Sequence, residues 1–118
     1  MVFFFVRDMM FTSKIREVAR QLGVQVASIP PKAATDATAL PAMGPETRLI
    51  IVDLRLPEAL TLLTTIAGSA AHKGFKSVGF IDHERTDVMD SARALGCGEV
   101  MAKGQFANSL PRLLAPAP

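Results

Sequence analysis

Residues 49–57, LIIVDLRLP, place a carboxylate at the end of an apolar run. Residues 49–52 are uninterrupted apolar side chains, which is typical of a strand covered on both faces of a parallel sheet. Asp53 follows directly, and Pro57 stands four positions later. In open parallel sheets, functional groups gather outside the carboxyl ends of the strands. We therefore interpret Asp53 as a candidate site residue, at the point where this strand surfaces into a cleft.

Other apolar runs repeat this pattern along the chain, and segments of helical period link them. The predicted strands are residues 2–6, 24–28, 49–52, 78–81 and 99–102. The clearest predicted helix has Thr12 or Ser13 as its N-cap and Gly23 as its stop. Two further helices are expected to end at Gly74 and Gly96. One or two turns are expected within residues 35–43, and a short last helix is expected to begin at Ser109.

Alternating strands and helices indicate parallel strand pairing with right-handed crossovers. The fold class is therefore predicted to be α/β, with a parallel sheet between two helical layers. If the strand order is 2-1-3-4-5, the first and third strands are neighbours where the order reverses, and Asp8 lies near Asp53. A single domain is expected over residues 1–115, followed by a Pro-rich tail at 116–118.

Composition excludes several functional classes. The formal charge is +2 among 118 residues, and no cluster of Lys and Arg predicts a nucleic-acid partner. No segment approaches the ~20 apolar residues of a membrane span. Cys97 is the single cysteine, so no internal disulfide is possible, and we expect it to be a small buried residue. The expected location is the cytoplasm.

Two motifs resemble the receiver domains of bacterial two-component response regulators, the CheY-like family. Residues 50–57, IIVDLRLP, are similar to the third strand of that family, and residues 92–104, ARALGCGEVMAKG, are similar to its turn, fifth strand and lysine. The resemblance implies a flavodoxin-like (βα)5 fold with strand order 2-1-3-4-5. It places Asp53 at the phosphoacceptor position and Lys103 at the lysine that pairs with phosphoryl oxygens.

The chain departs from this family where a magnesium ion and a switch hydroxyl are expected. The acidic pair after the first strand falls on Arg7 and Asp8, or on Val6 and Arg7, so an arginine replaces a metal ligand in either register. The switch hydroxyl falls on Ile81 or Asp82. Asp82 could equally be the N-cap of the following helix. We predict that a nitrogen of Arg7 or Lys103 lies within hydrogen-bonding range of Asp53.

These departures favour a degenerate receiver, or pseudo-receiver, with no enzymatic activity and no cofactor. Its expected partner is a protein: a histidine kinase, another signalling protein or a second copy of the chain. The alternative is a functional receiver that is phosphorylated on Asp53 by a histidine kinase and uses Mg²⁺. A third interpretation is an unrelated flavodoxin-like domain with a small ligand in the same crevice. Met9, Met10 and Phe11 are expected to be core residues or a partner-binding patch.

Overall fold

The computed structural model describes residues 1–41, 47–68 and 75–116 of the chain, and the statements below refer to them. Five strands form one sheet in the order β2-β1-β3-β4-β5, and all neighbouring strands are parallel. The predicted strand order is therefore confirmed. The strands are β1 (Val2–Phe5), β2 (Val26–Ser28), β3 (Leu49–Asp53), β4 (Lys76–Ile81) and β5 (Glu99–Ala102).

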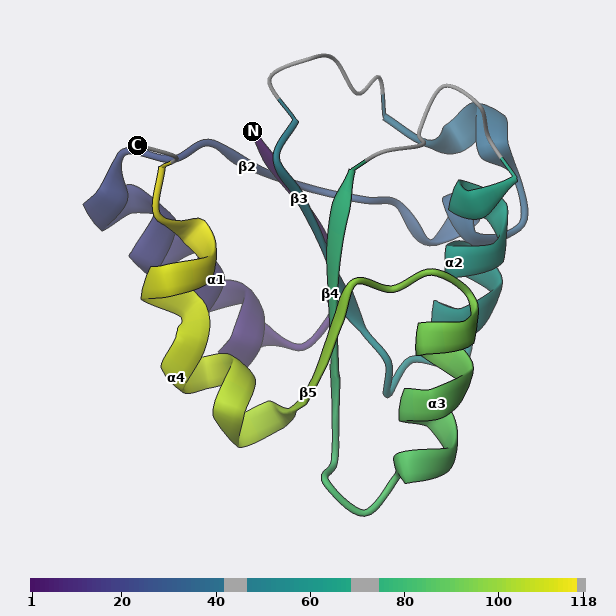
Figure 1. Ribbon diagram of the computed structural model, residues 1–118. Helices are drawn as coiled ribbons and strands as arrows, with labels where there is room; N and C mark the ends of the chain where they lie inside the picture. Colours follow the sequence, from purple (N-terminus) through teal and green to yellow (C-terminus); the bar gives the residue numbers. More distant parts are fainter. Residues whose placement is uncertain (42–46, 69–74, 117–118) are drawn as a thin grey trace.

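Helices cover both faces of this sheet, as Figure 1 shows. They are α1 (Met9–Leu22), α2 (Ala59–Ala67), α3 (Thr86–Ala94) and α4 (Lys103–Leu114). Helices α1 and α4 pack on one face, while α2 and α3 pack on the other. The predicted three-layer α/β architecture is confirmed. Within the described residues, no helix is long and apolar enough to cross a membrane.

Side-chain alternation along the strands divides the interior into two cores. Successive strand residues point to opposite faces, so β1 sends Val2 and Phe4 toward α1 and α4, and Phe3 and Phe5 toward α2 and α3. Strand β3 lies between β1 and β4 and is buried along its whole length. This position explains its unbroken apolar run, because both of its faces are covered.

Helix α1 begins earlier than predicted. Its N-cap is Asp8, not Thr12 or Ser13, and the Asp8 carboxylate accepts a 2.8 Å hydrogen bond from the backbone amide of Phe11. The predicted stop is confirmed, because Gly23 adopts a left-handed conformation with φ of 69° that suits glycine. Phe11 is therefore a core residue of the first turn, whereas Met9 and Met10 are 83% and 69% exposed.

The crossover from β2 to β3 contains two short 3-10 helices, η1 (Pro31–Ala34) and η2 (Ala37–Ala39). The expected turns within 35–43 are thus formed in part by η2, while residues 42–46 lie outside the described chain. Within the described residues, these two 3-10 helices and no α-helix occupy the crossover, so four α-helices surround the predicted five-stranded parallel sheet. Pro31 stands at the first position of η1, where a missing amide proton leaves no hydrogen bond of the helix unmade.

The last helix is longer than expected and begins at Lys103, not at Ser109. Phe106, Leu110 and Leu114 are fully buried against the sheet at helical spacing, and this packing stabilises the helix although Pro111 lies inside it. The expected end of the helix after β3, at Gly74, lies outside the described residues.

Candidate functional site

Asp53 ends β3, but it does not surface into an open cleft as predicted. Its exposed fraction is only 1%, and the register places it opposite Phe80 of β4. Leu49, Ile51 and Asp53 alternate onto the same face of the strand, the one covered by α1 and α4. A carboxylate buried there needs a cation or several donors, because an unpaired buried charge is strongly unfavourable.

Arg55 supplies the cation. Its Nε and Nη2 donate to Oδ1 and Oδ2 of Asp53 at 2.9 Å and 2.8 Å, a bidentate arrangement. The backbone amide of Arg55 donates to the same Oδ1 at 3.0 Å. Nη2 also reaches Oδ2 of Asp8 at 3.2 Å, so one guanidinium joins the carboxylates that follow β1 and β3. These hydrogen bonds, with Asp53 as the largest contributor, raise the pKa of Arg55 above its ordinary value.

Aromatic rings hold this guanidinium in place. The Cζ atom of Arg55 lies 5.0 Å from the ring centroid of Phe11 and 5.6 Å from that of Phe80. Both distances are within the range of cation–π attraction. Phe80 in turn stacks on Phe106 of α4, with centroids 4.1 Å apart and an interplanar angle of 9°. Arg55 is therefore positioned by β4, α1 and α4 as well as by its carboxylates.

Arg7 does not take the place predicted for it. Its Nη1 pairs with Oε1 of Glu58 at 3.2 Å, and its guanidinium lies 5.3 Å from the ring centroid of Phe5. Phe5 belongs to the core on the other face of the sheet, so Arg7 is directed away from Asp53. Of the two adjacent residues, the structure brings Asp8 to Arg55 and leaves Arg7 outside.

Lys103 also pairs with a different acid than expected. Its Nζ lies 2.9 Å from Oδ1 of Asp82, just past the carboxyl end of β4, and this ion pair is the main cause of the lowered pKa of Asp82. The predicted contact of Arg7 or Lys103 with Asp53 is therefore wrong, and Arg55 makes it instead. Asp82 is not the N-cap of α3, since Arg85 holds that position.

The site thus consists of two neighbouring charge groups at the carboxyl edge of the sheet: Asp8–Arg55–Asp53 and Asp82–Lys103. Magnesium prefers carboxylate oxygens. Here, however, one Asp8 oxygen caps α1, the other contacts Arg55, and both Asp53 oxygens accept from Arg55. Among the described residues, no group of three or more His, Cys, Asp or Glu side chains could hold a metal ion. The donor set does not fit a divalent cation while Arg55 stays in place.

Arg55 is the site residue that sequence reasoning missed. A signal was present, because an aspartate often accepts a hydrogen bond from the backbone amide two residues later. In 49–57 that residue is an arginine. Such a turn brings the arginine stem to the side of the strand on which the carboxylate lies.

No protein-family model matches the chain, and no curated protein is detectably similar to it. Solved structures, however, share its fold. The receiver domain of a sensor histidine kinase from Pseudomonas aeruginosa PAO1, with magnesium coordinated in the active site cleft, superimposes with a TM-score of 0.70 at 14% identity, covering 96% of this chain and 95% of that one.

Two further structures agree with this result. The phosphorylated cyanobacterial phytochrome response regulator RcpA matches with a TM-score of 0.72 at 16% identity, covering 96% of this chain and 86% of that one. The isolated receiver domain of RcsB from Salmonella enterica serovar Typhimurium, in the apo form, matches with a TM-score of 0.71 at 16% identity and coverages of 94% and 81%. The chain therefore has the CheY-like receiver fold of two-component response regulators.

Proposed function

We propose that this chain is a pseudo-receiver: a receiver-like signalling domain that acts by binding another protein and does not require Mg²⁺-dependent phosphorylation of Asp53. The observation that carries this proposal is the bidentate contact of Arg55 with the buried Asp53 carboxylate. Arg55 places a permanent positive charge where the related chemistry would recruit a metal ion. Both Asp53 oxygens already accept hydrogen bonds, so the nucleophile is engaged.

Displacing Arg55 is energetically unfavourable. A bound metal or phosphoryl group would have to move a guanidinium that also contacts Asp8 and lies near the Phe11 and Phe80 rings. Withdrawing the guanidinium before another cation arrives leaves the buried Asp53 charge without compensation, at a cost of roughly 3–5 kcal/mol. This cost supports a resting state in which Arg55 occupies Asp53.

The proposed partner is a protein of a two-component or phosphorelay pathway: a histidine kinase, another signalling protein or a second copy of the chain. One structure with this fold is the receiver domain of a sensor histidine kinase, which supports the kinase as a candidate. The exposed side chains of Met9 and Met10 on the first turn of α1 provide apolar contact area beside the site. Methionine suits such a surface because its flexible side chain adapts to different partners.

The experiment is an amide NMR titration with Mg²⁺ and beryllofluoride, which mimics an aspartyl phosphate. We expect no saturable shift at Asp53, Asp8 or Lys103 in the wild-type protein. An Asp53→Asn variant serves as the matched control, because any shift that survives it does not report on the acceptor. A receiver domain that is known to bind beryllofluoride verifies the reagent.

Saturable shifts centred on Asp53 and lost in Asp53→Asn would overturn the proposal. They would support the alternative, a functional response-regulator receiver that is phosphorylated on Asp53 by a histidine kinase. Repeating the titration on Arg55→Met tests the assigned cause. If Arg55 is the barrier, this variant gains a response to Mg²⁺ that the wild-type protein lacks.

A further inference from the structure

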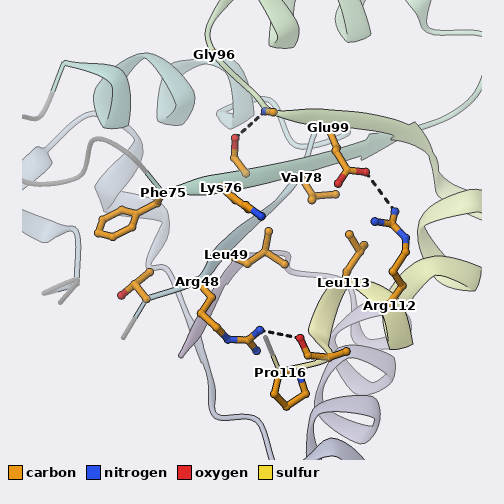
Figure 2. Close-up of a pocket in the computed structure, with 14 residues that line it drawn as sticks. Arg48, Leu49, Phe75, Lys76, Val78, Gly96, Glu99, Arg112, Leu113 and Pro116 are labelled. Atoms are coloured by element: carbon orange, nitrogen blue, oxygen red, sulfur yellow. Dashed lines mark hydrogen bonds and ion pairs between the residues drawn. The ribbon is translucent and has the colours of Figure 1, made fainter. Parts of the chain in front are cut away.

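A pocket of about 890 Å³ opens at the end of the sheet opposite to Asp53 (Figure 2). The amino ends of β3, β4 and β5 and the carboxyl end of α4 contribute its walls. Leu49, at the start of β3, lines it, while Asp53 ends the same strand. At ~3.3 Å per residue, the two sites are about 13 Å apart along β3. The size is typical of sites for small molecules, which occupy roughly 300–1,000 Å³.

The floor of this pocket is apolar. Leu49, Val78 and Leu113 gather in its centre, with Phe75 and Pro116 at its margin (Figure 2). The strand register explains the arrangement, because Leu49 pairs with Lys76 and Val78 lies two residues further along the same face of β4. The pocket therefore offers aliphatic contact to a ligand body.

Positive charge surrounds that floor. Arg48, Lys76 and Arg112 line the pocket, whereas Glu99 is the one acidic residue among the described residues that line it. Arg48 donates to the carbonyl oxygens of Ala115 and Leu114 at 2.8 Å and 3.1 Å, and Arg112 pairs with Glu99 at 3.2 Å. Lys76 is exposed and has no ion-pair partner among the described residues. Its ammonium group is available to an anion.

We propose that the pocket binds a small amphipathic anion, with a short apolar body and one carboxylate or phosphate group. The body packs on Leu49, Val78 and Leu113, and the anionic group lies at Lys76. This inference goes beyond the proposed function and does not depend on it, because none of these residues belongs to the Asp53 site.

The test is an amide NMR titration with octanoate and with octyl phosphate, both below their critical micelle concentrations. Octyl glucoside, which has the same chain and no charge, is the control ligand. We expect saturable shifts at Ser77, Val78, Glu99 and Leu113 with the two anions and much weaker ones with the glucoside. The relative affinities of octanoate and octyl phosphate identify the preferred anionic group.

Two charge-reversal variants separate specific binding from general attraction. Lys76→Glu is expected to weaken octanoate or octyl phosphate binding by tenfold or more, since a charge-assisted contact is lost. The matched control is Lys14→Glu, which changes an exposed lysine on α1 and is expected to leave the affinity unchanged. Equal loss in both variants would overturn the assigned anion position.

The proposal is overturned if the glucoside binds as well as the anions, if no shift saturates, or if the shifts centre on Asp53.

Discussion

Replacing Arg55 with methionine removes the cation from the buried Asp53 carboxylate. Methionine keeps an unbranched stem that can pack near Phe11 and Phe80, so the main loss is electrostatic. Two side-chain hydrogen bonds to Asp53 and one to Asp8 disappear. The backbone amide of residue 55 still donates to Asp53. We expect a large loss of stability with no change in fold.

The magnitude follows from the burial of the pair. Breaking a buried ion pair by removing one partner costs roughly 3–5 kcal/mol. Asp53 is 1% exposed, but the Arg55 side chain is 28% exposed and the remaining backbone amide compensates part of the charge. These facts place the expected loss near the lower limit, at about 3 kcal/mol. That is a large share of the ~5–15 kcal/mol that stabilises an ordinary domain.

Urea denaturation at pH 7, followed by circular dichroism, measures this loss. With a slope of about 1.5 kcal/mol per molar urea, the midpoint should fall by about 2 M. The matched control is Arg20→Met. Arg20 also forms two hydrogen bonds to one carboxylate, that of Glu17, but its side chain is 71% exposed and the pair is screened by solvent. We expect this control to leave the midpoint nearly unchanged.

A double-mutant cycle with Asp53→Asn separates the pair from other effects of substitution. Since the double variant leaves no buried charge at position 53, the two changes should be strongly non-additive, with a coupling energy of about 2 kcal/mol or more. A coupling energy below ~0.5 kcal/mol would refute the reasoning. So would an Arg55→Met midpoint equal to that of Arg20→Met.

Three further predictions concern neighbouring features. Asp8→Ala removes the N-cap of α1 and its hydrogen bond to the Phe11 amide, so the free energy of unfolding should fall by about 1 kcal/mol, measured by urea denaturation. Lys103 lowers the pKa of Asp82, so their contact stabilises the fold fully above pH ~4 and less as pH falls through the folded-state pKa. In Lys103→Met, carboxyl NMR should show a raised Asp82 pKa. The loss of stability relative to the wild-type protein should be smaller below pH ~4 than at pH 7. Burial raises the pKa of the Cys97 thiol, so a thiol reagent at pH 7 should modify it only at the rate of unfolding; rapid modification of the native protein would contradict its burial.

Local patterns in the sequence predicted most of the fold. Residues 2–6, 49–52 and 78–81 contain no polar side chain and predicted three strands, because a strand covered on both faces favours apolar side chains at every position. The runs at 24–28 and 99–102 include Gln25 and Glu99, and they form the partly buried edge strands β2 and β5. The stop of α1 at Gly23 was predicted for a similar reason, since a left-handed cap favours glycine. Helix starts were less predictable. Thr12, Ser13 and Asp8 can all cap a helix. Asp8 is the cap in the structure, in which Phe11 of the first turn packs against Phe80.

Residues 49–57 alone indicate that a carboxylate ends an apolar strand, and the chain holds several cations that are candidate partners for it. Which cation pairs with which acid depends on the assembled fold. Arg7, Arg55 and Lys103 are all plausible partners of Asp53 in the sequence, yet they pair with Glu58, Asp53 and Asp82 respectively. Ion pairing is long-ranged and does not depend on spacing in the chain. The choice follows from the direction of each stem and from the aromatic rings beside Arg55, and these arise only when the strands and helices are assembled.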